Sequence, residues 1–419
     1  MNLSISHFNN LKRIDKANYY YIIINVGLSA FSFLRSFVFM RYLDLRELGI
    51  ISLVQTIFMF IGLLQIGLLN GGYRIVSLGK EEEMEKTNNT IYSYLAILLP
   101  IGLLFCFLSS CYNWIKELTL VLLLISVIFG VFSLLNNWYH NMLIGEQKLI
   151  ELNMLNIVSY VLSALLLPLA YLLGFWGAMF VIMIQPLAFV GIGMVRNKEM
   201  RPTDFFFDIK YVKYILSFGF IPFLGGIFSV LYLQVERWSI NQVLGVEALG
   251  SFYLVFLYVS LYQLVPNSLN AIFFPKGVKS YADKQYIDFN NIIKYYFLTI
   301  VGYGVLITIV TFLFLRPIVA FVFPNHLLGV SFVYIILPGL IMMSLYAPIG
   351  LILNSSVILK PMLIADSTNL LLNVIIIFAL IGFGAFSLHN LAVLRTVSGA
   401  YMLAVYIAVY FIIRKRLYN

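Results

Sequence analysis

The sequence is a near-unbroken series of apolar stretches of about twenty residues between Tyr19 and Phe411. An α-helix rises about 1.5 Å per residue, so one such stretch crosses the roughly 30 Å hydrocarbon core of a bilayer. Hydrophobic residues make up 62% of the chain and charged residues 11%, which leaves too little polar surface for a soluble fold. The sequence therefore predicts an all-α integral membrane protein.

Charges, prolines and glycines divide this series into about twelve predicted transmembrane helices. These spans cover residues 19–41, 48–71, 89–111, 118–144, 149–173, 177–195, 214–240, 249–274, 292–315, 330–353, 362–381 and 388–413. We expect two pseudo-symmetric bundles of six helices, an N-terminal bundle over residues 1–205 and a C-terminal bundle over residues 206–419. The basic loop Arg196–Lys213 joins them.

Two short motifs recur in the second half of the chain and indicate this duplication. Leu43–Gly49 follows the first span and Leu244–Gly250 follows the seventh, and both end in a Leu-Gly pair. Gly174–Ala178 follows the fifth span, and the shorter Gly382–Ala385 follows the eleventh. Because an even number of spans separates each pair, the halves keep the same membrane orientation and are related by an axis along the membrane normal.

Basic residues gather on one predicted side of the membrane. With the N-terminus inside, most Lys and Arg residues fall on the cytoplasmic side, and only Arg41, Arg46, Lys116 and Arg316 fall outside. Cytoplasmic loops carry such an excess, so we expect both termini in the cytoplasm. The net charge of +9 is thus interpreted as a topology signal and not as a sign of a nucleic-acid partner.

Polar residues recur at helical spacing inside several spans. The sets are Asn25, Ser29 and Ser32 in the first span, Asn153, Asn156 and Ser163 in the fifth, Gln263, Asn267 and Asn270 in the eighth, and Asp366, Asn369 and Asn373 in the eleventh. Residues spaced three, four or seven apart share one helix face, so each set is a candidate wall of a substrate-binding cavity. Alternatively, such side chains join helices to one another by hydrogen bonds.

Several charged residues lie inside predicted spans, where an arginine costs about 2.5–3.5 kcal/mol and must face protein or water. Arg35, Arg237 and Arg395 are candidate substrate-binding residues, because a guanidinium binds two oxygens of a phosphate at once. Glu236 and Asp366 are candidate sites for coupling to a proton or sodium gradient. The alternative is that an arginine neutralises one of these carboxylates across the bundle.

Pro222, Gly225 and Gly226 interrupt the seventh span and form the predicted hinge. The sequence has neither a phosphate-binding loop nor histidines at metal-ligand spacing. We therefore expect a transporter without a cofactor or metal, driven by a proton, sodium or substrate gradient, and not an enzyme.

Several segments in both halves resemble the polysaccharide-transporter branch of the MOP exporter superfamily. They are Arg41–Gly49, Gly62–Leu68 and Arg74 in the first half, and Ser217–Pro222, Glu236-Arg237 and Leu249–Phe252 in the second. Together with the length and the number of spans, the resemblance covers essentially the whole chain. It implies the MATE-like fold of that superfamily.

The resemblance also implies a Wzx-type flippase in the bacterial inner membrane. Such a protein moves undecaprenyl-diphosphate-linked oligosaccharide, an O-antigen or similar repeat unit, from the cytoplasmic to the periplasmic leaflet during lipopolysaccharide biosynthesis, by alternating access through a central cationic cavity. Membrane lipids, a polysaccharide polymerase and the chain-length machinery are the implied partners.

Two other functions stay open. Multidrug antiporters of the same superfamily share the architecture, but their cargo is usually cationic and Arg35 and Arg395 argue against it. A membrane-embedded polysaccharide polymerase would need a sizeable loop outside the membrane, and the longest connections are Arg196–Lys213 and Pro275–Asn291.

The charge asymmetry leads to a topology prediction. In a chain lacking Cys106 and Cys111, we expect an impermeant thiol reagent on intact cells to label a cysteine at Asn325 but not one at Lys198, because positive loops stay in the cytoplasm. Labelling of the Lys198 site alone would show that the orientation is reversed.

Overall fold

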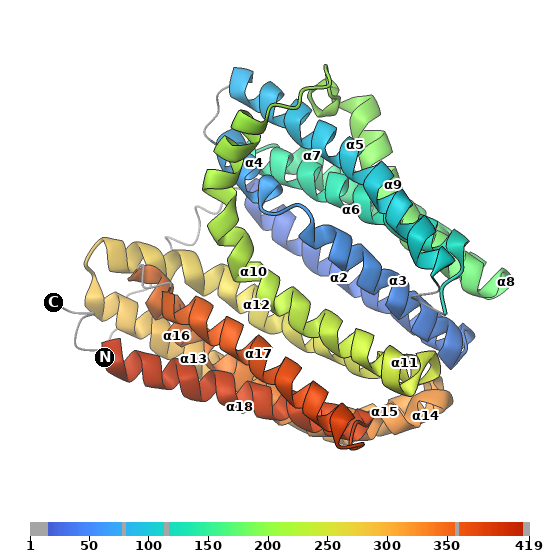
Figure 1. Cartoon of the computed structure of the whole chain (residues 1–419). Helices are drawn as coiled ribbons and strands as arrows, with labels where there is room; N and C mark the ends of the chain where they lie inside the picture. The colour runs from blue at the N-terminus through green and yellow to red at the C-terminus, as the bar shows by residue number, and fades with distance from the viewer. Residues whose placement is uncertain (1–15, 78–80, 113–116, 357–359, 414–419) are drawn as a thin grey trace. The chain divides into compact units, whose positions relative to one another are not determined.

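The computed structural model describes residues 16–77, 81–112, 117–356 and 360–413, and it is all-helical over them (Figure 1). The first half contains α2 (Lys16–Tyr42), α3 (Leu45–Leu63), α4 (Leu68–Ser77), α5 (Glu81–Cys111), α6 (Leu120–Gly145), α7 (Leu149–Leu165), α8 (Pro168–Leu172) and α9 (Gly174–Arg196). The second half contains α10 (Ile209–Leu244), α11 (Val246–Ser251), α12 (Tyr253–Ala282), α13 (Tyr286–Val310), the π-helix η3 (Thr311–Leu315), α14 (Arg316–Val322), α15 (Leu327–Leu345), α16 (Ala347–Ser355), α17 (Lys360–Gly382) and α18 (Leu388–Ile413). The predicted all-α fold class is confirmed.

Each predicted span lies on one helix or on consecutive shorter helices. Within the described residues, ten helical segments are long and apolar enough to cross a membrane. They account for every predicted span except the first and the seventh, which form α2 and α10. The chain is therefore a multi-pass membrane protein.

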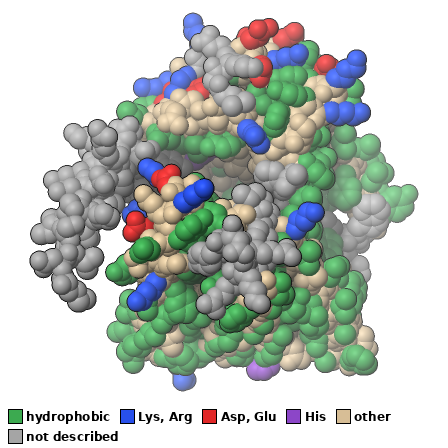
Figure 2. Space-filling model, turned by 90° about the vertical axis from the view of Figure 1, so that its left-hand side faces the viewer, with side chains coloured by type: hydrophobic (Ala, Val, Ile, Leu, Met, Phe, Trp, Pro, Cys, Tyr) green, Lys and Arg blue, Asp and Glu red, His purple; other side chains and the backbone are tan. Residues whose placement is uncertain are grey.

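The surface is hydrophobic over large continuous areas (Figure 2). Large side chains such as Phe297, Leu306 and Phe321 are exposed. A soluble monomer rarely exposes contiguous apolar patches of more than a few hundred Å², whereas a lipid-facing exterior requires them. The exposed face of these helices thus fits contact with hydrocarbon.

Contacts between Cα atoms divide the chain into two compact units. Unit 1 comprises residues Met1–Leu43 and Ile57–Phe223, and unit 2 comprises Asp44–Thr56 and Leu224–Asn419. The predicted boundary after residue 205 is drawn from the repeated motifs, whereas these units are drawn from contacts. The contact division in addition places the start of α3 in unit 2 and the start of α10 in unit 1.

The division of α10 falls between Phe223 and Leu224, among the predicted hinge residues. The helix is continuous there, so Pro222, Gly225 and Gly226 do not break it. Outside its own stretch of helix, no described atom lies within 4 Å of the position that a Cβ on Gly226 would take, and the surroundings of Pro222 and Gly225 lie outside what the structure describes. Their role as a hinge stays a prediction.

The same pairs of helices pack together inside each unit. In unit 1, α4 contacts α5 and α6, and α9 contacts α6 and α7. In unit 2, the equivalent α12 contacts α13 and α15, and α18 contacts α15 and α17. Each unit thus repeats one packing scheme, in agreement with the two recurring motifs.

The first recurring motif forms a close helix crossing within unit 2. A Cβ on Gly49 would overlap the carbonyl oxygen of Val246, and a Cβ on Gly250 would overlap that of Leu45. The contacts are reciprocal, because each glycine lies against the residue four positions before the other. Only glycine lets two helix backbones approach this closely. The glycines of the two Leu-Gly pairs therefore allow these helices to pack closely.

This crossing predicts the effect of single alanines. Gly49→Ala and Gly250→Ala should each lower the unfolding midpoint of the detergent-purified protein, because overpacking costs about 1–3 kcal/mol. Gly302→Ala is the matched control, since no atom lies within 4 Å of its Cβ position on α13. Unchanged midpoints for Gly49→Ala and Gly250→Ala would contradict the close crossing.

Candidate functional site

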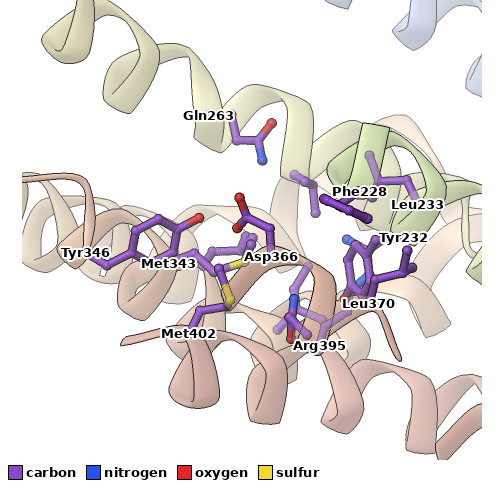
Figure 3. A pocket seen from close by; sticks show the side chains of 14 residues that line it. Phe228, Tyr232, Leu233, Gln263, Met343, Tyr346, Asp366, Leu370, Arg395 and Met402 are labelled. Carbon is purple, nitrogen blue, oxygen red and sulfur yellow. The ribbon is translucent and has the colours of Figure 1, made fainter. Parts of the chain in front are cut away.

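A cavity of about 170 Å³ with several polar side chains in its wall lies within unit 2 among α10, α12, α15, α17 and α18. Its polar wall includes Gln263, Asp366, Asn369 and Arg395. Gln263 on α12 and Asp366 on α17 point toward each other across the cavity (Figure 3). The cavity thus combines an amide and a carboxylate inside the membrane-spanning bundle.

An adjoining cavity of about 320 Å³ has four amide side chains in a lining that is otherwise largely apolar and aromatic. Gln263, Asn267 and Asn270, predicted from their spacing on the eighth span, all line it, and Asn354 on α16 joins them. The rings of Tyr346 and Tyr406, which also line it, stack with their centroids 4.4 Å apart. Gln263 and Tyr346 belong to both cavities, which we call the unit-2 cavities. Substrate binding by these residues stays a prediction.

The polar residues predicted on the eleventh span have two different roles. Asp366 and Asn369 line the first cavity. Asn373 instead joins α17 to α18, because its Oδ1 accepts a hydrogen bond from the Ser398 hydroxyl at 2.7 Å, while its Nδ2 donates to the carbonyl of Asn369. In the described part of the chain the Asp366 side chain has no hydrogen-bond or ionic partner. Asp366 is therefore a carboxylate that faces the cavity unpaired.

A buried ion pair joins α10 to α18 at one side of the first cavity. Nε of Arg395 lies 2.9 Å from both carboxylate oxygens of Glu236, and its Nη2 binds one of them as well. The two side chains are only 6% and 3% exposed. The sequence left open whether an arginine neutralises Glu236, and this pairing is what the structure shows. Arg395 is thus not a free cation, and Glu236 is not a free carboxylate.

The third predicted arginine, Arg237, is half-buried. Its guanidinium lies 4.5 Å from the centre of the Phe256 ring, and its Nε has no hydrogen-bond partner among the described residues. Arg237 is not among the residues that line the unit-2 cavities. Its predicted contact with substrate therefore stays without structural support.

In unit 1, Arg35 donates a hydrogen bond of 3.4 Å to Oε1 of Gln185 on α9, and Gln185 lines a further cavity of about 490 Å³. Ser32, predicted beside it, donates instead to the carbonyl of Leu28 in its own helix. The side chains of Asn25 and Ser29 lie outside the described residues.

The fifth-span set again combines cavity and packing roles. Asn156 lines the unit-1 cavity and lies 3.1 Å from Nε2 of His140, whereas Ser163 donates to the carbonyl of Val181 and joins α7 to α9. Asn153 is buried. Sequence reasoning missed the polar face of α6 in this cavity, although Asn137 and Asn141 are four residues apart in the fourth span.

Comparison with solved structures finds the same arrangement of helices in transporters. The lipid II flippase MurJ in an inward closed conformation matches with a TM-score of 0.70 and 16% identity, over 94% of this chain and 87% of MurJ. The MATE multidrug transporter DinF-BH matches with a TM-score of 0.70 and 16% identity, over 97% of both chains. An inward-facing multidrug resistance MATE family transporter of the MOP superfamily matches with a TM-score of 0.65 and 14% identity, over 94% of this chain and 98% of that one.

The chain has the MATE-like fold of these transporters. No protein-family model matches the sequence, and a search of curated proteins finds no match. The predicted MATE-like architecture is confirmed at the level of the fold.

The buried ion pair predicts an asymmetric response to mutation. Glu236→Met alone should lower the yield and unfolding midpoint of purified protein, because it leaves a buried charge unpaired at a cost of about 3–5 kcal/mol. Glu236→Met combined with Arg395→Met should recover much of the loss, since both charges are then gone. Glu247→Gln, at an exposed position on α11, is the control and should have no effect. A double variant no more stable than the single one would contradict this account.

Proposed function

We propose that this chain is a Wzx-type flippase of the MOP superfamily. Its substrate is an undecaprenyl-diphosphate-linked oligosaccharide, an O-antigen or similar repeat unit, which it moves from the cytoplasmic to the periplasmic leaflet of the bacterial inner membrane by alternating access. The observation that carries this proposal is the group of four amide side chains that converge on one cavity within a membrane bundle whose fold resembles that of a lipid II flippase.

The substrate itself requires such a cavity. A hydroxylated head group cannot enter hydrocarbon, because each unsatisfied polar group costs several kcal/mol there. Amides both donate and accept hydrogen bonds, as hydroxyl groups do, and Gln263, Asn267 and Asn270 present them together. The stacked rings of Tyr346 and Tyr406 add an apolar face beside these polar groups. The cavity therefore suits a sugar, which has both kinds of surface.

We assign ion coupling to Asp366, the unpaired carboxylate of the first cavity. Glu236, also predicted for this role, is held by Arg395 and cannot bind a proton or sodium ion without losing that pair. Both termini would lie in the cytoplasm, and a polysaccharide polymerase with the chain-length machinery would use the exported repeat units.

A multidrug or cation antiporter is the second candidate. The same Asp366 carboxylate favours it, because an unpaired negative charge in a membrane cavity attracts a cationic drug. Two of the transporters with this fold are multidrug transporters of the MATE type. The amide side chains in the unit-2 cavities favour the flippase, because amides match hydroxyl groups and contribute no net charge.

Reconstituted vesicles distinguish these functions. We expect the protein to expose an undecaprenyl-diphosphate-linked oligosaccharide to an impermeant glycosidase, faster under an imposed proton or sodium gradient. Asp366→Asn should fold normally and lose the response to the gradient, because the ionisable group is gone. Asp288→Asn, exposed at the start of α13, is the matched control.

One result would contradict the flippase, and another would contradict only the coupling role of Asp366. Uptake of a cationic dye driven by the gradient, without any oligosaccharide exposure, would establish the antiporter instead. Gradient-stimulated exposure by a well-folded Asp366→Asn protein would remove Asp366 from the coupling step while leaving the flippase intact.

A further inference from the structure

The cavity in unit 1 is walled mainly by uncharged amide side chains. Gln65, Asn70, Asn136, Asn137, Asn141 and Gln185 line it, and no Asp, Glu, Lys or Arg is among the described residues that do so. We call this cavity the amide pocket. It differs from the first of the unit-2 cavities, whose wall includes Asp366 and Arg395.

The local sequence of α6 directs these amides into the pocket. Trp138 and Tyr139 are completely buried, and Nε1 of Trp138 donates a hydrogen bond of 2.8 Å to Oδ1 of Asn88 on α5. This contact fixes the rotation of α6 about its axis. Asn137 and Asn141, one helical turn apart, then face the same cavity.

Most of the hydrogen-bonding capacity of the pocket is unused. Asn70, Asn136, Asn137 and Asn141 have no side-chain hydrogen-bond partner in the described part of the chain. Oε1 of Gln65 is buried and also has none there. Amides that only join helices would be paired with each other or with backbone. These groups instead require water or a ligand, because a bilayer offers no alternative partner.

The chemistry of the wall selects the class of ligand. A cationic ligand would need a carboxylate and a diphosphate would need a guanidinium or ammonium group, and neither is among the described residues of the wall. Several converging amides that both donate and accept match a neutral molecule with many hydroxyl groups. Tyr160 and His140 add ring faces to the same wall. We infer that the amide pocket binds neutral sugar residues, those of the lipid-linked substrate under the proposed function on which this inference rests.

The depth of the pocket agrees with this role. Asn137 and Asn141 lie eight and four residues before the end of α6 at Gly145, which is roughly 12 and 6 Å along the helix. On the predicted topology this end faces the cytoplasm. The pocket would therefore receive the sugars on the side where the substrate is loaded, before translocation.

Direct binding to the purified full-length protein tests the inference. We expect a free neutral oligosaccharide, followed by saturation-transfer NMR or calorimetry, to bind the wild-type protein. The double variant Asn137→Leu with Asn141→Leu should weaken this binding about tenfold, since two hydrogen-bonding groups are lost with little change in side-chain size. Asn291→Leu, at an exposed position on α13, is the control. A sugar-free undecaprenyl diphosphate should bind the variant and the wild type equally.

Two outcomes overturn the inference. Absence of oligosaccharide binding to the wild type, or equal binding by the double variant, excludes a sugar site in this pocket. An equal loss of affinity for the sugar-free lipid shows a structural effect of the two leucines, and the single variants Asn70→Leu and Asn136→Leu then repeat the comparison. Oligosaccharide binding without transport in vesicles would refute the flippase and leave the sugar site standing. Transport without such binding would support the flippase and exclude the sugar site.

Discussion

Hydrocarbon offers no hydrogen-bond partner, so a polar side chain between the membrane surfaces must be paired inside the protein or face water. This constraint divides the polar residues of the membrane-spanning helices into those that are paired inside the protein and those that face a cavity. Glu236 and Arg395 satisfy each other, and Asn373 is bound by Ser398 and the backbone of its own helix. Among the described residues Asp366 has no such partner, and it opens onto a cavity. Paired residues hold helices together, and unpaired ones mark the places where a polar substrate or ion can bind.

The same constraint explains why small residues control the packing. Hydrocarbon tails are as apolar as leucine, so burying apolar side chains between membrane helices gains little, and close backbone contact becomes decisive. The reciprocal contacts of Gly49 and Gly250 are of this kind. In unit 1, Gly71 and Gly219 are likewise positions where a Cβ would overlap a backbone carbonyl of the opposite segment. These crossings supply part of the rigid framework on which the cavities depend.

Much of the fold followed from sequence pattern, and the candidate site followed in part. Gln263, Asn267 and Asn270 were predicted as one helix face, and all three line one cavity, because helical spacing alone decides which residues share a face. The sequence offered an arginine–carboxylate pair as an alternative, but it could not decide which two residues form it, since Arg395 and Glu236 are 159 positions apart and their contact depends on how α10 meets α18. The amide pocket was missed for a similar reason, because its residues come from several helices and most segments contribute only one or two of them.

The sequence by itself determined that this chain spans a membrane many times, that its halves repeat, and which helix faces are polar. These properties are local, because length, apolarity and periodicity are read within one helix. Only the tertiary structure decided which polar residues pair and which remain open, because a side chain finds its partner on another helix. Arg395 and Asp366 are both charged residues within spans, and neither pattern nor composition separates them. Their neighbours do: both line the same cavity, but Arg395 is paired with Glu236, whereas Asp366 has no partner among the described residues.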